Sequence, residues 1–344
     1  MTPGLSLYQI VIGFLNWLGS PAWLSELLYR VLVGLLMMGF IALVALFLIW
    51  MLRKEMGRMQ LRIGPNVLGP AGIFQTSADA LKILLKEDIV PAKADRPMFI
   101  LAPYLGFLAA GMTYMVIPLG PRVIVNDLNV GLLFFVAFGS LTALSILIAG
   151  WGSNNKYSLV GGMRSVAQMV SYEVPMVIAL LGPVLLAGTL STVGIVEAQS
   201  SLWFIILQPL GFLIYFVAGL AETNQTPFDL PEGESELIAG FHVEYSGMRF
   251  ALFFLSEFAA TFAIAAMTAT LFLGGWSGPL LPPVVWFLIK TLALVFVMMW
   301  IRSTWPRFRI DQVMGFTWKV LLPLALLNVL IAAVEVVLIH GFGA

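Results

Sequence analysis

Long apolar stretches alternate with short polar ones along most of the chain. A helix that crosses a bilayer needs about 20 mostly apolar residues. Runs of that kind lie at about 30–51, 98–118, 130–150, 168–190, 202–221, 250–274, 283–301 and 317–340. The pattern predicts an all-α integral membrane protein, a bundle of eight transmembrane helices in which 1–344 form one membrane domain. A shorter apolar stretch, Leu5–Leu18, fits an amphipathic helix at the membrane interface.

The composition supports this prediction and excludes several classes of protein. Hydrophobic residues make up 60% of the 344 residues and charged residues 10%, whereas soluble globular chains have about 25% charged residues. The net charge is zero, so nucleic acid is not an expected partner. The chain has no cysteine, and its two histidines lack the helical spacing of a metal site. We therefore expect neither a metal nor a bound cofactor on this chain.

The basic residues indicate how the bundle is oriented. Most of them lie in the loops 52–97, 151–167, 222–249 and 302–316, whereas Arg122 is the basic residue of the intervening loops. By the positive-inside rule, the basic loops face the cytoplasm and both termini lie on the non-cytoplasmic side.

Two cytoplasmic loops are predicted to fold. Loop 52–97 contains an amphipathic stretch, Ala78–Lys86, which Ser77 is placed to cap. This interfacial helix either anchors the loop or forms one wall of an entry path for an amphiphilic substrate. The acidic loop 222–249 also carries apolar residues that a free loop would not need, namely Pro227, Phe228, Leu230, Leu237, Ile238, Phe241 and Tyr245. We favour a loop folded into a protein-covered cavity over a solvated loop.

Four charged residues fall inside predicted spans, where each must be paired, neutralised or in contact with water. Glu335 lies near an outer end and is expected to reach the interface. Lys290 lies deeper, so it either pairs with a carboxylate such as Glu257 or titrates within a proton path. Glu173 and Glu257 extend the acidic loop into the bilayer. Such a row of carboxylates suits a proton relay, and separate polar contacts that hold the helices together are an equally good interpretation.

Several long motifs carry a resemblance to a known family. They are Gly57–Asn66, Ala78–Lys82, Lys86–Asp88, Gly150–Tyr157, Arg164 through Ser171–Glu173, Ala221–Asn224, Pro227–Leu237, Glu244–Ser246, and Arg302 through Pro306–Gln312. In this order they resemble the H-type membrane subunit of bacterial respiratory complex I, called subunit 1 in mitochondria. The resemblance covers nearly everything from about residue 30 onward.

The resemblance implies a membrane subunit of a proton-translocating NAD(P)H:quinone oxidoreductase, which is not catalytic alone. Quinone would be the substrate, and this subunit would form the mouth and floor of its chamber. The implied partners are soluble quinone-site subunits, small membrane subunits, antiporter-like subunits and membrane lipid, with the iron–sulfur clusters and flavin on partner subunits. The implied location is a bacterial plasma membrane or a related energy-converting membrane.

The resemblance also assigns residues to two groups. The quinone-chamber positions are Arg53, Asp79, Gln225, Phe228 and Arg302. The carboxylate funnel that links quinone reduction to proton pumping consists of Glu173, Glu222, Glu232, Glu234, Glu236, Glu244 and Glu257, with Arg164 beside Glu173. Lys290 joins this proton path because of its place in a span.

Two positions depart from the family pattern. The family usually has glutamate where this chain has Leu52, and arginine where it has Gln225. We hypothesise that these two positions are partners that were lost together, because an unpaired buried charge is costly.

Two other functions fit parts of the sequence. The membrane anchor subunit of an energy-converting hydrogenase would share the bundle and its acidic residues, but the long cytoplasmic motifs favour complex I. A stand-alone secondary transporter would need its own midplane site, typically within an inverted repeat, and the sequence contains no clear repeat.

Overall fold

The computed structural model describes residues 21–121, 123–231 and 233–340. The predicted interfacial helix Leu5–Leu18 lies outside them. The chain divides into two compact units, residues 1–43 and 44–344. Every site discussed below belongs to the second unit.

Within the described residues, seven helices are long and apolar enough to cross a membrane. They are α2 (Ala22–Met59), α4 (Arg96–Thr113) with its continuation to Val116, α5 (Gly131–Gly152), α6 (Lys156–Ala187), α11 (Gly247–Phe272), α12 (Pro283–Thr304), and α13 (Ile310–Phe316) continuing through a π-helical turn (Thr317–Leu321) into α14 (Leu322–His340). The predicted class, an all-α integral membrane bundle, is confirmed.

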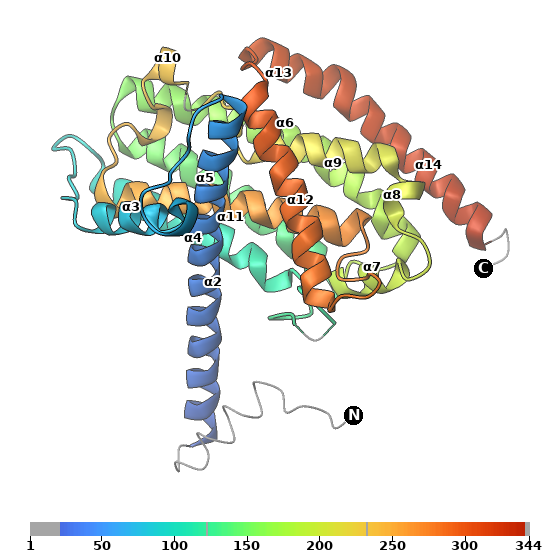
Figure 1. The fold of residues 1–344 in the computed structure, drawn as a ribbon. Coiled ribbons are helices and arrows are strands. Elements are labelled where there is room, and N and C mark those ends of the chain that lie inside the picture. Colours follow the sequence, from blue (N-terminus) through green and yellow to red (C-terminus); the bar gives the residue numbers. More distant parts are fainter. Residues whose placement is uncertain (1–20, 122, 232, 341–344) are drawn as a thin grey trace. The chain divides into compact units, whose positions relative to one another are not determined.

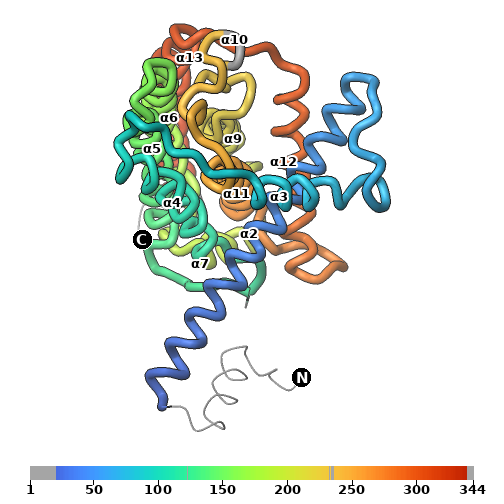
Figure 2. The backbone as a smooth tube through the Cα atoms, turned by 90° about the vertical axis from the view of Figure 1, so that its left-hand side faces the viewer, coloured from blue at the N-terminus to red at the C-terminus, as the bar shows by residue number. Residues whose placement is uncertain are grey.

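The predicted span 202–221 is built from two shorter pieces, α8 (Phe204–Leu207) and α9 (Pro209–Glu222). The break falls at Pro209, because proline has no backbone N–H with which to continue a helix and is favoured in a first turn. The remaining short helices are α3 (Gln75–Leu84), α7 (Thr192–Ala198) and α10 (Glu234–Leu237). Figures 1 and 2 place α10 and α13 at one end of the bundle and α7 at the other.

Three predicted boundaries were wrong for a common reason. Helix α2 continues to Met59, so Arg53 is helical rather than in a loop. Helix α6 starts at Lys156, where the Asn155 side chain caps it, and thus absorbs most of loop 151–167. Helix α3 begins at Gln75, and its N-cap residue makes no side-chain hydrogen bond, so the Ser77 cap is also wrong. Hydropathy detects the apolar part of a helix and misses its polar extension.

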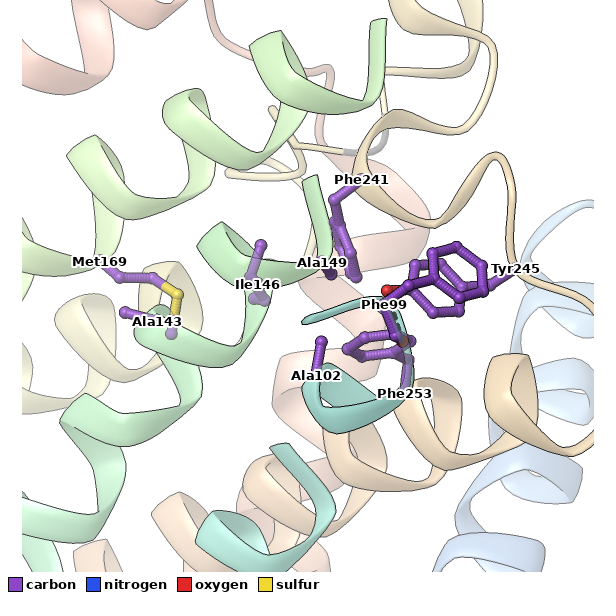
Figure 3. Packing of buried hydrophobic residues seen from close by; sticks show 9 residues of the cluster. All are labelled: Phe99, Ala102, Ala143, Ile146, Ala149, Met169, Phe241, Tyr245 and Phe253. Atoms are coloured by element: carbon purple, nitrogen blue, oxygen red, sulfur yellow. Dashed lines mark hydrogen bonds between the residues drawn. The ribbon is translucent and has the colours of Figure 1, made fainter. Parts of the chain in front are cut away.

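The acidic loop is folded between helices, as predicted. Residues 240–247, here called the inserted segment, contain the short 3-10 helix η3 (Gly240–His242) and end where α11 begins. The Tyr245 ring stacks on Phe99 of α4 with centroids 4.1 Å apart and meets Phe253 of α11 edge-on at 5.0 Å (Figure 3). Ser158 of α6 donates a hydrogen bond of 2.8 Å to the Phe241 carbonyl. Of the apolar residues named above, Ile238 is the exception, because it is exposed.

The inserted segment approaches α6 closely because both backbones have glycine at the contact. A Cβ atom on Gly161 would lie 2.8 Å from the Gly240 Cα. A Cβ atom does not approach another atom this closely in real structures. Because the facing Gly240 atom belongs to the backbone, no side-chain rotation could relieve the clash. The contact therefore fixes the inserted segment against α6.

We expect Gly161→Ala to destabilise the protein. At an open position inside a helix, replacing glycine with alanine raises the free energy of unfolding by roughly 0.5–1 kcal/mol. At this contact the added methyl group overpacks the interface, which lowers that free energy by about 1–3 kcal/mol. The measurement is the thermal unfolding midpoint of the purified complex. Gly315→Ala is the matched control, because no atom lies within 4 Å of a Cβ at that helical glycine. Equal midpoints for the two variants would contradict the close contact.

Candidate functional site

A buried hollow, here called the carboxylate cavity, lies between α5, α11, the end of α9 and the inserted segment. Its volume is about 40 Å³, which is room for about three water molecules. The polar residues that line it are Thr142, Ser145, Glu222, Asn224, His242, Ser256 and Glu257. A small cavity with this lining suits a few water molecules held between carboxyl groups.

Glu222 is the most buried of the predicted funnel residues with a described side chain, at 9% exposed. One of its carboxyl oxygens has no hydrogen-bond partner among the described residues. The other faces α5, where a Cβ on Gly139 would lie 3.7 Å from Glu222 Oε1. The adjacent Ser140 donates a hydrogen bond to Glu173 of α6. One turn of α5 therefore brings Glu222 and Glu173 into the same neighbourhood.

Glu257 is the second acid of the cavity, and its partner is Arg302. The two side chains lie 3.1 Å apart and are 15% and 18% exposed, respectively. Gln225 donates a hydrogen bond of 2.9 Å to Thr261, one turn further along α11. Two residues assigned to the quinone chamber thus contact α11: Arg302 at Glu257 and Gln225 at Thr261, one turn away.

The other acidic-loop residues do not continue this group. Glu236 is 56% exposed and accepts a hydrogen bond of 2.6 Å from Arg164, which lowers the pKa of Glu236. The implied placement of Arg164 beside Glu173 is therefore wrong. Glu244 accepts a hydrogen bond of 2.6 Å from Asn155 at the start of α6. Glu232 and the side chain of Glu234 lie outside the described residues.

Lys290 does not make the contact with Glu257 that was one of its two predicted alternatives. Its ammonium group donates to the carbonyls of Leu273 at 2.6 Å, Gly275 at 3.1 Å and Ser277 at 2.6 Å. It also lies 4.2 Å from the centre of the Trp203 ring. Pairing with Glu257 is therefore wrong. The lysine instead donates hydrogen bonds to backbone carbonyls of the C-cap and of the turn that follows α11.

A separate hollow, here called the quinone cleft after its assigned residues, has a volume of about 390 Å³. Arg53 of α2 and Asp79 of α3 form an ion pair there, and both were predicted. The remaining lining residues are Lys82, Ile83, Lys86, Tyr245, Ser246, Gly247 and Phe250. The end of the inserted segment therefore forms one wall of this cleft.

Backbone contacts fix that wall to the loop that follows α3. Gly247 has a φ of +55°, and a Cβ on it would lie 3.1 Å from the Lys86 carbonyl oxygen. The Ile89 N–H donates to Ser246 Oγ at 3.1 Å, and Arg249 forms an ion pair of 3.1 Å with Asp88. These contacts hold the inserted segment against the loop that follows α3 as well as against α6.

Phe228, the remaining quinone-chamber residue, lines neither of these hollows. It lies in the wall of an apolar cavity of about 530 Å³ together with Trp305 and Phe308. The adjacent Asp229 forms an ion pair with Arg307 at 3.1 Å. The five residues assigned to the quinone are thus distributed over three places in the described structure.

Two functional candidates were missed by the sequence reasoning. His242 lines the carboxylate cavity, and burial lowers its pKa from about 6.5 to about 4, so its ring is neutral at pH 7. Glu55 lies one turn after Leu52 on the buried side of α2, 5% exposed, and neither of its carboxyl oxygens has a hydrogen-bond partner among the described residues. Glu55 was taken as part of a charged loop because the helix was ended too early. His242 gave no signal apart from its place in the acidic loop.

Comparison with known proteins identifies the family. The family model described as NADH dehydrogenase matches residues 32–333. The H subunit of NADH-quinone oxidoreductase from Dehalococcoides mccartyi strain CBDB1 is 51% identical over 93% of this chain and 89% of its own length. The corresponding protein of Geobacillus kaustophilus is also 51% identical, over 93% of this chain and 97% of its own. That of Brevibacillus brevis is 48% identical over 92% and 96%, respectively. Because both kinds of match extend over most of the sequence, the chain belongs to the NADH dehydrogenase family.

Proposed function

We propose that this chain is the H-type membrane subunit of a proton-translocating NADH–quinone oxidoreductase, in which it forms part of the quinone site and the start of a proton path. The observation that carries the proposal is that the quinone cleft and the carboxylate cavity share a wall. The inserted segment contributes to both, and Phe250 lines both. A change of charge in the cleft would therefore act on carboxyl groups through protein rather than through water.

The quinone cleft offers the groups that a quinone headgroup needs. The carbonyl oxygens of a quinone accept hydrogen bonds. Arg53 and Lys86 line this cleft and are cationic donors. Ile83 and Phe250 supply apolar contact for the ring. Reduction to quinol requires two electrons and two protons. The electrons would come from iron–sulfur clusters and flavin on partner subunits, since this chain has no cysteine with which to hold a cluster.

The carboxylate cavity offers the groups that a proton path needs. Acidic side chains that face a water-filled cavity within a membrane typically mark such a path. Glu222 and Glu257 share the cavity, and Glu173 lies nearby across α5. Charges interact more strongly in a protein interior than in water, so the ionisation of these groups would respond to the state of the quinone. Lys290 has no carboxylate contact that would support including it.

The loop around α3 supports the proposed soluble partners. Leu61, Val67 and Leu85 are 96%, 93% and 88% exposed, respectively. Clustered exposed apolar residues commonly mark an interaction surface. Soluble quinone-site subunits would cover this surface on the cytoplasmic side, and antiporter-like and small membrane subunits would meet the apolar helices. Both termini would then face the non-cytoplasmic side.

We expect Glu222→Gln to impair coupled turnover while leaving the complex assembled. Removing an acid–base group from the path should slow quinone reduction by about 10²-fold and abolish the accompanying proton gradient. Both are measured in the same membrane vesicles with the native electron donor. Glu197→Gln is the control, because it makes the same change on α7 at the other end of the bundle. Unchanged rates in an assembled Glu222→Gln complex would show that this acid is structural.

Arg53→Gln should weaken quinone binding and preserve coupling. Loss of a hydrogen bond from a charged donor costs about 1.5–3 kcal/mol, so we expect the KM for a short-chain quinone to rise roughly tenfold or more. The number of protons moved per quinone reduced should not change. Arg309→Gln is the control, because it breaks an exposed Arg–Asp pair outside the cleft. An unaltered KM would remove Arg53 from the quinone site.

The lost-partner hypothesis predicts a non-additive result. Leu52→Glu or Gln225→Arg alone should lower quinone reductase activity, because each buries a single charge; both positions are buried in this structure. The double variant should be more active than the poorer single variant. A double variant no better than that single variant would mean that the two positions do not pair.

A further inference from the structure

His242 is a titratable group of the carboxylate cavity to which the proton path described above gives no role. It lies in η3, and its ring lines the cavity together with Glu222 and Glu257. The ring contacts Phe241 and Phe250 edge-on, with centroids 4.9 Å and 5.4 Å apart, respectively. Phe250 is also a wall of the quinone cleft. The imidazole thus lies on the side of the cavity that adjoins the cleft.

The backbone that carries His242 is held on both sides. Gly240 lies against Gly161 of α6, and the Phe241 carbonyl accepts a hydrogen bond from Ser158. The edge-on contacts with Phe241 and Phe250 leave the ring little freedom to turn. A rigid ring at a fixed distance from its neighbours is a condition for efficient proton transfer.

Among the charged groups on the elements around η3, Glu222 and Glu257 are the two that line the same cavity as His242. Helix α5, which packs against η3, contains no charged residue. Most other charged groups on α6, α11 and the surrounding loop have partners of their own: Arg164 with Glu236, Glu173 with Ser140, Arg249 with Asp88, and Glu244 with Asn155. Lys156 is exposed at the start of α6. Glu257, which pairs with Arg302, and Glu222 are the acids that line the same hollow as His242.

We propose that His242 is a further proton-carrying residue of the carboxylate cavity, which passes protons between the cavity acids and the side next to the quinone cleft. The proposal rests on the function proposed above, because it gives His242 a place in that same path. It concerns the transfer of a proton and requires no electron donor.

The chemistry of a partly buried, neutral imidazole fits this role. One ring nitrogen carries a hydrogen and the other accepts one. A proton from a carboxyl group, passed directly or through a cavity water, would bind to the acceptor nitrogen and leave a carboxylate. The nitrogen on the other side would then release its own proton, which leaves the ring neutral as the other tautomer; exchange of ring protons with cavity water would restore the first tautomer. The pKa of about 4 keeps the imidazolium short-lived, and a nearby ionised carboxylate favours its formation.

The test compares His242→Gln with His242→Glu in membrane vesicles that contain the assembled complex. Glutamine and glutamate have nearly the same shape, but only glutamate binds and releases a proton. We expect His242→Gln to slow quinone reduction and proton translocation by about 10²-fold and to increase the solvent deuterium isotope effect. His242→Glu should recover much of the rate. Val243→Ala, one residue along, controls for local disturbance.

The outcomes separate a carrier from a structural residue. Wild-type rates and isotope effect in His242→Gln would overturn the proposal. Equal slowing in both variants with an unchanged isotope effect would also overturn it, because shape alone would then matter. If His242→Glu does not assemble, the isotope effect of His242→Gln still decides. Glu222→Gln is measured in parallel: impairment there with no effect at His242 rejects this inference alone, whereas no effect in either variant rejects the proposed proton path as well.

Discussion

The arrangement of both candidate sites depends on a loop packed between membrane helices. The inserted segment enters the bundle because Gly161 and Gly240 allow two backbones to meet and because the Tyr245 ring stacks on Phe99. Its backbone stays hydrogen-bonded, for example through Ser158, and this is necessary because an unsatisfied peptide group in an apolar interior is costly. Once held in this way, the segment forms a wall of the carboxylate cavity on one side and of the quinone cleft on the other.

The carboxylates divide according to whether a cation balances them. Glu236 pairs with Arg164, and Asp229 pairs with Arg307. These pairs fix loops near helix ends, and the exposed one contributes little stability. Glu257 pairs with Arg302 but also lines the cavity. Glu222 lines it too, and one of its oxygens has no hydrogen-bond partner among the described residues. A carboxyl group without a fixed counter-charge is the one whose ionisation can follow changes elsewhere, and this distinguishes Glu222 from the acids that have an arginine partner.

Much of the fold follows from hydropathy, whereas the grouping of the site residues does not. Apolar runs identify the bundle, and the apolar residues of loop 222–249 indicate that it folds. The runs do not show that α6 extends to Lys156 or that Glu55 is helical, because polar residues at helix ends look like loop. The apolar runs also do not reveal which side chains from distant segments contact each other. Arg164 lies 72 residues from Glu236 in sequence, and Lys290 finds backbone carbonyls that no side-chain pattern reveals. Which side chains form ion pairs or hydrogen bonds depends on how the packed helices are rotated relative to each other, and this is a property of tertiary packing.

The shared wall also explains why two polar hollows can adjoin without merging. Phe250 lines both, and Phe241, Phe253 and Phe254 line the carboxylate cavity beside it. In the proposed proton path these aromatic rings would separate the two hollows as a partition, because a continuous water column would let protons pass without doing work. The same partition has a low dielectric constant, so a charge that appears on one side is felt strongly on the other. In the proposed function, the separation of the two hollows and the electrostatic contact between them would therefore follow from one feature, the inserted segment packed between helices.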